Sequence, residues 1–112
     1  MINTYPQIWI GGTRMTNFYV TYSFSDENTR RKFYEEVKAE KIGEKTRLED
    51  GCIRYAFFFD ADREDRMFLW EQWESRDAQK KHLQQPHFAT LSELKAKYVL
   101  DTEILVEDQY SK

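Results

Sequence analysis

The feature that most constrains the fold of this 112-residue chain is that its strand-like segments carry apolar side chains on both faces. Residues 53–59 and 67–74 show the alternation typical of β-strands, and large rings occupy both sets of alternating positions. The side chains expected to share one face are Ile53, Tyr55, Phe57 and Phe59 in the first segment and Leu69 and Trp73 in the second, with Phe58, Phe68 and Trp70 opposite. A sheet of such strands must be covered on both sides, because monomers rarely expose an apolar patch of that size.

The order of the segments predicts an α+β fold of the ferredoxin-like type. We expect a strand over residues 15–24, a helix capped by Ser25 that ends before Gly51 with a kink at Gly43, and then the two strands described above. A helical region follows over 76–98, capped by Ser75 and reopened at Pro86, and a last strand covers 102–106. This βαββαβ order builds a four-stranded antiparallel sheet with helices on one face. A second copy of the chain can cover the other face, so we expect a homodimer joined through the sheet faces.

Length, charge and cysteine usage narrow the class of protein. The chain is long enough for one domain, and we divide it into an N-terminal extension or arm (1–14), the domain (15–108) and a polar tail (109–112). A formal net charge of −3 without a basic stripe argues against nucleic acid as a partner. No apolar run is long enough to cross a membrane, and no signal-peptide pattern is present. Cys52 is the single cysteine and cannot form an internal disulfide. We therefore expect a cytoplasmic protein.

Several short motifs carry a resemblance to a known family. They are Glu71-Gln72-Trp73-Glu74-Ser75, His82-Leu83, Pro86-His87-Phe88, and Glu49-Asp50-Gly51-Cys52 with Tyr55 downstream. In order and spacing the chain resembles the antibiotic biosynthesis monooxygenase family, and in particular its quinol monooxygenase members. The resemblance implies a dimeric α+β barrel and a monooxygenase that needs no cofactor. Its partners would be a small aromatic substrate, a phenol or quinol, and molecular oxygen.

The residues proposed to carry chemistry are two histidines and four strand residues. His82 has an unperturbed pKa near neutrality and suits a proton acceptor or donor, and His87 is a second catalytic candidate or a structural residue at the helix bend. Tyr55 and one of Trp70 and Trp73 are expected to line the pocket with His82, between the helices and the sheet. Asn17 is a further substrate-binding candidate, because a buried amide must be hydrogen-bonded and some family members use an asparagine on the first strand.

Other functions on the same fold remain alternatives. Haem degradation is disfavoured, because haem-degrading members carry a tryptophan where this chain has His82 and a histidine where it has Ser92. Isomerisation of a small sugar-like signalling molecule and non-catalytic ligand binding are the other two. We expect no metal, since two histidines five residues apart form a poor metal signal, and no organic cofactor, since flavin and nicotinamide fingerprints are missing.

Overall fold

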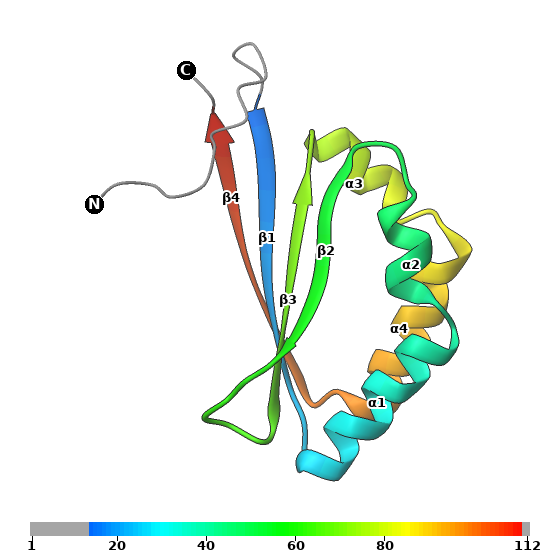
Figure 1. Cartoon of the computed structure of the whole chain (residues 1–112), viewed down its shortest axis with the longest axis vertical. Helices are drawn as coiled ribbons and strands as arrows, with labels where there is room; N and C mark the ends of the chain where they lie inside the picture. The colour runs from blue at the N-terminus through cyan, green and yellow to red at the C-terminus, as the bar shows by residue number, and fades with distance from the viewer. Residues whose placement is uncertain (1–13, 111–112) are drawn as a thin grey trace.

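A computed structural model describes residues 14–110, which form one antiparallel sheet and four helices (Figure 1). The elements follow in the order β1 (Arg14–Ser23), α1 (Glu27–Ala39), α2 (Ile42–Arg47), β2 (Cys52–Phe59), β3 (Arg66–Trp73), α3 (Arg76–His82), α4 (Pro86–Tyr98) and β4 (Asp101–Tyr110). All four helices lie on the same side of the sheet in Figure 1. None of the described helices is long and apolar enough to cross a membrane.

The sheet confirms the predicted ferredoxin-like topology. Its strands lie in the order β2-β3-β1-β4, and every neighbouring pair is antiparallel. Across the central pair, Val20 is opposite Leu69 and Tyr19 is opposite Trp70. Because side chains alternate along each strand, Val20 and Leu69 share the face toward the helices, and Tyr19 and Trp70 share the other. The register thus places these strand residues either on the face covered by the helices or on the opposite face of the sheet.

The core lies between the sheet and the helices and is largely aromatic. Phe33 and Val37 of α1 are buried, as are Leu91 and Leu94 of α4, at the positions that the helical spacing predicts. The Phe33 ring meets Tyr22 of β1 edge to face at a centroid distance of 5.6 Å. Interlocked rings of this kind hold the α1–α4 layer at a fixed height above the sheet, which positions the side chains of the site.

The first helical region differs from the prediction in its N-cap residue and in the position where the helix is interrupted. Asp26, not Ser25, is the N-cap of α1, and its side chain accepts a hydrogen bond from the Thr29 backbone N–H at 2.7 Å. The helix is interrupted at Lys41, which has a left-handed backbone (φ 55°), and Gly43 lies inside the short α2 instead of forming a kink. The break turns α2 so that the segment after it approaches α3 and α4.

The strands contain two further differences. The β2–β3 register shifts between Cys52 and Arg54, so Cys52 pairs with Trp73, and the alternation that placed Ile53 on the Tyr55 face is wrong at that residue. Ile53 is instead 42% exposed at the bulge. The last strand runs through Tyr110, so Gln109 and Tyr110, expected in the tail, belong to β4. The proposed arm at 1–14 lies, apart from Arg14, outside the described residues, as do the last two residues of the tail.

Candidate active site

His82 is the last residue of α3 and lies in a cage of aromatic rings. Ser75 caps this helix as predicted, since its hydroxyl accepts from the Ala78 backbone N–H at 3.1 Å. The His82 ring has its centroid 5.7 Å from that of Tyr55, 5.1 Å from that of Trp73 and 5.2 Å from that of Phe88. Tyr55, Trp73 and His82 are each no more than 1% exposed, so they fill the space between α3 and the sheet by direct packing.

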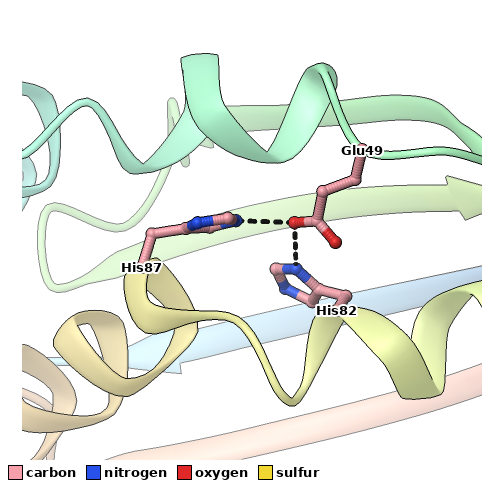
Figure 2. Close-up of side chains that lie close together, drawn as sticks. All are labelled: Glu49, His82 and His87. Carbon is pink, nitrogen blue, oxygen red and sulfur yellow. Dashed lines mark hydrogen bonds and ion pairs between the residues drawn. The ribbon is translucent and has the colours of Figure 1, made fainter.

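Glu49 joins the two histidines through one oxygen atom. Its Oε2 lies 2.7 Å from His82 Nδ1 and 2.6 Å from His87 Nε2 (Figure 2). Glu49 belongs to the connection between α2 and β2, which turns at Gly51 (φ 83°). His87 is the second residue of α4, directly after Pro86 at the helix start, as the sequence predicts. Three separate elements therefore converge on this carboxylate.

Burial of the His82 ring favours its neutral form. Burial lowers the pKa of His82, and the hydrogen bond and charge of Glu49 oppose that effect only in part. A neutral imidazole can donate its Nδ1–H to Glu49 Oε2. The neighbouring Tyr55 hydroxyl is buried without a hydrogen-bond partner among the described residues, and burial raises its pKa well above the usual value.

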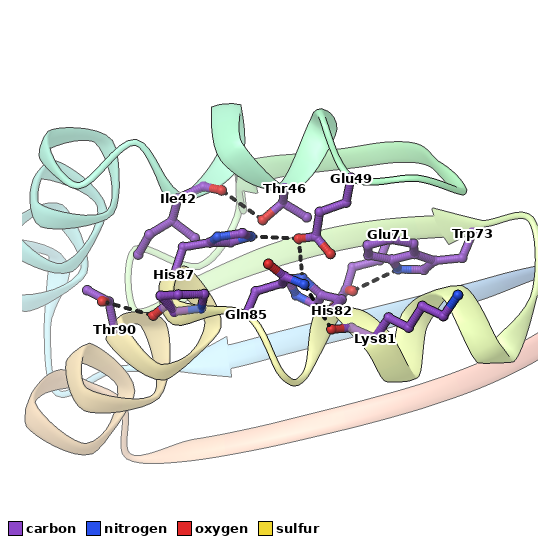
Figure 3. Close-up of polar contacts among 11 residues, drawn as sticks. Ile42, Thr46, Glu49, Glu71, Trp73, Lys81, His82, Gln85, His87 and Thr90 are labelled. Carbon is purple, nitrogen blue, oxygen red and sulfur yellow. Dashed lines mark hydrogen bonds and ion pairs between the residues drawn. The ribbon is translucent and has the colours of Figure 1, made fainter.

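Glu71 of β3 is the strongly perturbed acid of the site. Its Oε1 accepts a hydrogen bond from Trp73 Nε1 at 3.1 Å (Figure 3). Burial raises the pKa of Glu71 to about 7, although the Trp73 hydrogen bond and the charge of Lys95 on α4 lower it. Burial also lowers the pKa of Lys95. A carboxyl group poised near neutral pH in a cleft is a physical signature of acid–base function.

A small cavity between the helices and the sheet leads to Glu71. Its volume is about 120 Å³. Its walls are formed by Phe18, Val20, Tyr22, Glu71, Gln79, Leu83, Phe88, Leu91, Lys95 and Ile104. Leu83 is 40% exposed and Ile104 52% exposed, so the cavity reaches the surface between α3 and β4. Most of the lining is apolar, with Glu71, Gln79 and Lys95 as the side chains that can orient a bound molecule.

Two of the predicted binding residues lie on the opposite face of the sheet. Asn17 accepts a hydrogen bond from Trp70 Nε1 at 2.9 Å and donates to Gln109 Oε1 at 3.0 Å. The Arg54 guanidinium lies 4.3 Å from the centre of the Trp70 ring. The amide of Asn17 is therefore satisfied by its neighbours on the open face, and Asn17 and Trp70 are separated by the sheet from the Glu71 cavity.

The structure brings together some predicted site residues and adds two that the sequence analysis did not propose. Tyr55, Trp73, His82 and His87 meet on the helix side, and of the two tryptophans it is Trp73 that lies there. None of these four residues is among those that line the 120 Å³ cavity, so the predicted lining by Tyr55, a tryptophan and His82 does not describe this cavity. Glu49 and Glu71 belong to two of the short family-like motifs, but no role was predicted for either. The sequence did contain a signal for Glu71: it alternates with Leu69 and Trp73 on the same face of an apolar strand, where a carboxylate is unusual.

The four-stranded antiparallel sheet with its helices on one face defines a ferredoxin-like α+β domain. The antibiotic biosynthesis monooxygenase family profile matches residues 19–94. This chain therefore belongs to the antibiotic biosynthesis monooxygenase family, as its motifs predicted. None of the curated proteins compared with the chain matches it.

Solved structures share the fold at low sequence identity. A candidate antibiotic biosynthesis monooxygenase from Nitrosomonas europaea is 20% identical, with a TM-score of 0.76 over 91% of this chain and 95% of that one. A second such candidate, from Deinococcus radiodurans, is 24% identical, with a TM-score of 0.70 over 82% and 89%. A conserved protein from Methanosarcina mazei is 17% identical, with a TM-score of 0.72 over 89% and 95%. At these identities the likeness establishes the fold.

Proposed function

We propose that the chain is a cofactor-independent monooxygenase that oxidises a small phenol or quinol with molecular oxygen in the Glu71 cavity. The observation that carries the proposal is the buried Glu71 carboxyl, whose pKa is raised to about 7 in an apolar cavity. An apolar cavity of roughly 150 Å³ admits benzene. A cavity of about 120 Å³ with an open side suits one aromatic ring.

The cavity offers the groups that such a reaction needs. Glu71 in its ionised form accepts the phenolic proton, and the resulting anion passes electrons to oxygen. Lys95 lies in the same wall and stabilises negative charge on the phenolate and on reduced oxygen. For a simple phenol the balance is one phenol and one O₂ giving one quinone and one water, so the substrate supplies every electron.

The histidine cluster enters the proposal as support for the base. The Trp73 ring contacts His82 on one side and donates its N–H to Glu71 on the other. His82, fixed by Glu49, holds Trp73 in the orientation that delivers this hydrogen bond. The sequence-based proposal that His82 itself is the base thus competes directly with the assignment to Glu71, and one experiment separates the two.

Oxygen uptake with a panel of small phenols and hydroquinones tests the proposal. We expect turnover by the unmodified protein and a loss of roughly 100-fold in Glu71→Gln, the usual scale for a positioned acid or base. His82→Asn, which keeps a side-chain N–H near Glu49 but loses the ring against Trp73, should lose much less of the rate than Glu71→Gln, and circular dichroism checks that both variants fold.

Three results would contradict the proposal in different ways. A Glu71→Gln rate equal to that of the unmodified protein removes Glu71 as the base. A folded His82→Asn variant that alone loses turnover returns the role to His82. No uptake with any member of the panel favours the isomerase or the non-catalytic binding alternative.

A further inference from the structure

In the Glu49–His82–His87 cluster, the two histidines share one carboxylate oxygen, which simple hydrogen bonding of two N–H groups to a glutamate does not require. Both imidazoles approach the same carboxylate oxygen, Glu49 Oε2, at 2.7 and 2.6 Å (Figure 2). A glutamate that only has to satisfy two N–H donors can use its two oxygens. Here the three possible ligand atoms, Glu49 Oε2, His82 Nδ1 and His87 Nε2, lie within 4.8 Å of one another.

We propose that Glu49, His82 and His87 form a binding site for a divalent transition-metal ion of the Zn²⁺ class. Two imidazole nitrogens and one carboxylate oxygen make a ligand set that Zn²⁺ accepts, with a fourth position left for water. None of its three residues lines the Glu71 cavity, so the ion would not touch the substrate of the proposed oxidation.

Only small movements are needed to admit the ion. Tetrahedral ligands at about 2.1 Å from zinc lie roughly 3.4 Å apart. Each nitrogen must therefore move away from Glu49 Oε2 by about 0.7 to 0.8 Å. The two nitrogens, which now lie within 4.8 Å of each other, must also settle at about 3.4 Å. The rings need not lose a proton, because a neutral imidazole can carry its hydrogen on the other nitrogen, which frees His82 Nδ1 and His87 Nε2 to bind metal.

The surroundings give the ion a route in and a source of water. The cluster borders a surface cleft of about 370 Å³. The residues that line this cleft are Lys45, Leu48, Glu49, Asp50, Lys81, Gln85 and His87. The inner ligand, His82, is 1% exposed and fixed by rings, whereas the Glu49 and His87 side chains are 12% and 10% exposed. One rigid ligand and two at the cleft make a partly preformed site whose fourth position faces solvent.

A bound ion would fasten together three elements of the helical layer. Glu49 follows α2, His82 ends α3 and His87 begins α4, and sequence separations of 33 and 38 residues divide Glu49 from the two histidines. Joining segments so distant in the chain stabilises the folded state by the free energy of metal binding. The expected role is therefore structural, with the layer above Trp73 held more rigidly.

Binding of Zn²⁺ and Co²⁺ by the tag-free protein tests the site. Isothermal titration should give one equivalent of Zn²⁺, Co²⁺ should develop visible d–d absorption, and Zn²⁺ should raise the melting temperature. Glu49→Gln and His87→Gln, both at the cleft, should weaken binding by at least 100-fold, above the roughly 10–100-fold typical of outer-sphere changes. Neither variant should gain thermal stability from Zn²⁺.

Two controls make the result specific to this cluster. The chain has two histidines and one cysteine, so Cys52→Ser should bind Zn²⁺ as tightly as the unmodified protein. Glu44→Gln, on α2 outside the cluster, should do the same. Absence of Zn²⁺ and Co²⁺ binding by the unmodified protein would overturn the proposal, as would equal affinity in folded Glu49→Gln and His87→Gln.

Discussion

At the scale of single residues, Glu71 shows how burial sets chemistry. A carboxyl group with its ordinary pKa would be ionised at neutral pH and a weak base for a phenol. Enclosure by Tyr22, Leu91 and the other walls of the cavity raises its pKa to about 7, so that both protonation states are accessible at neutral pH. The same shift has a consequence for stability that can be measured without any substrate.

We predict that Glu71 makes the unfolding free energy fall as the pH rises from 4.5 to about 7. The folded-state pKa, about 7, lies above the model-peptide value of 4.5, so folding favours the protonated form. The contribution is fully present below pH 4.5 and is lost as the pH rises through the folded-state pKa. At about 1.36 kcal/mol per pKa unit, the loss relative to Glu71→Gln is on the order of 3 kcal/mol.

Denaturant unfolding of the unmodified protein and Glu71→Gln at several pH values provides the measurement. Lys95→Met is the companion variant, because removing that cation should raise the pKa of Glu71 further and extend the decline to higher pH. Parallel stability curves for the unmodified protein and Glu71→Gln between pH 4.5 and 8 would show that Glu71 titrates normally.

At the scale of elements, the sequence determined the strands and helices better than the contacts between them. Alternation and helical spacing predicted all four strands and the inward positions of α1 and α4, because burial acts directly on those periodicities. The bulge after Cys52 and the break at Lys41 have no periodic sequence pattern that predicts them. The bulge moves Ile53 off the predicted face, and the break separates α2 from α1. Glu49 lies in the irregular connection between α2 and β2, so the spacing of residues along the sequence could not predict its contact with the two histidines.

The turn at Gly51 supports the site and gives an element-scale prediction. Gly51 has φ 83°, and a Cβ built there would lie 2.6 Å from Ala78 Cβ on α3. Gly51→Ala should therefore destabilise the protein by roughly 1–3 kcal/mol, through backbone strain and the clash with α3. Chemical denaturation measures the change.

Gly43→Ala is the matched control for this prediction. Gly43 lies within α2, and a Cβ there would lie 3.0 Å from the Arg47 guanidinium, which donates a hydrogen bond to the Tyr55 carbonyl oxygen at 2.7 Å. The gain in helix propensity, up to about 1 kcal/mol, should offset that contact, leaving stability unchanged or slightly raised. Equal effects of the two substitutions would show that the Gly51 turn imposes no special constraint.

At the scale of the whole molecule, the helices leave one face of the sheet uncovered (Figure 1). That face carries a continuous row of rings, in which Phe68 lies 6.3 Å from Tyr19 and 6.0 Å from Phe58 between ring centroids. Phe58 is 46% exposed and Leu105 of β4 61% exposed. Apolar groups spread over neighbouring strands of one face mark an interaction surface rather than scattered exposure.

We predict that the chain is a homodimer joined through this open face, and that one charge placed there separates the subunits. Leu105→Glu should give a monomer, because the carboxylate would be buried without a partner in a self-complementary interface. Leu100→Glu is the control: Leu100 is 72% exposed but lies between α4 and β4, outside the sheet. Light scattering should give twice the chain mass of 13.6 kDa for the unmodified protein and the control, and 13.6 kDa for Leu105→Glu. An unmodified protein that is monomeric at micromolar concentration, or a Leu105→Glu variant that remains dimeric, would place the contact elsewhere or remove it.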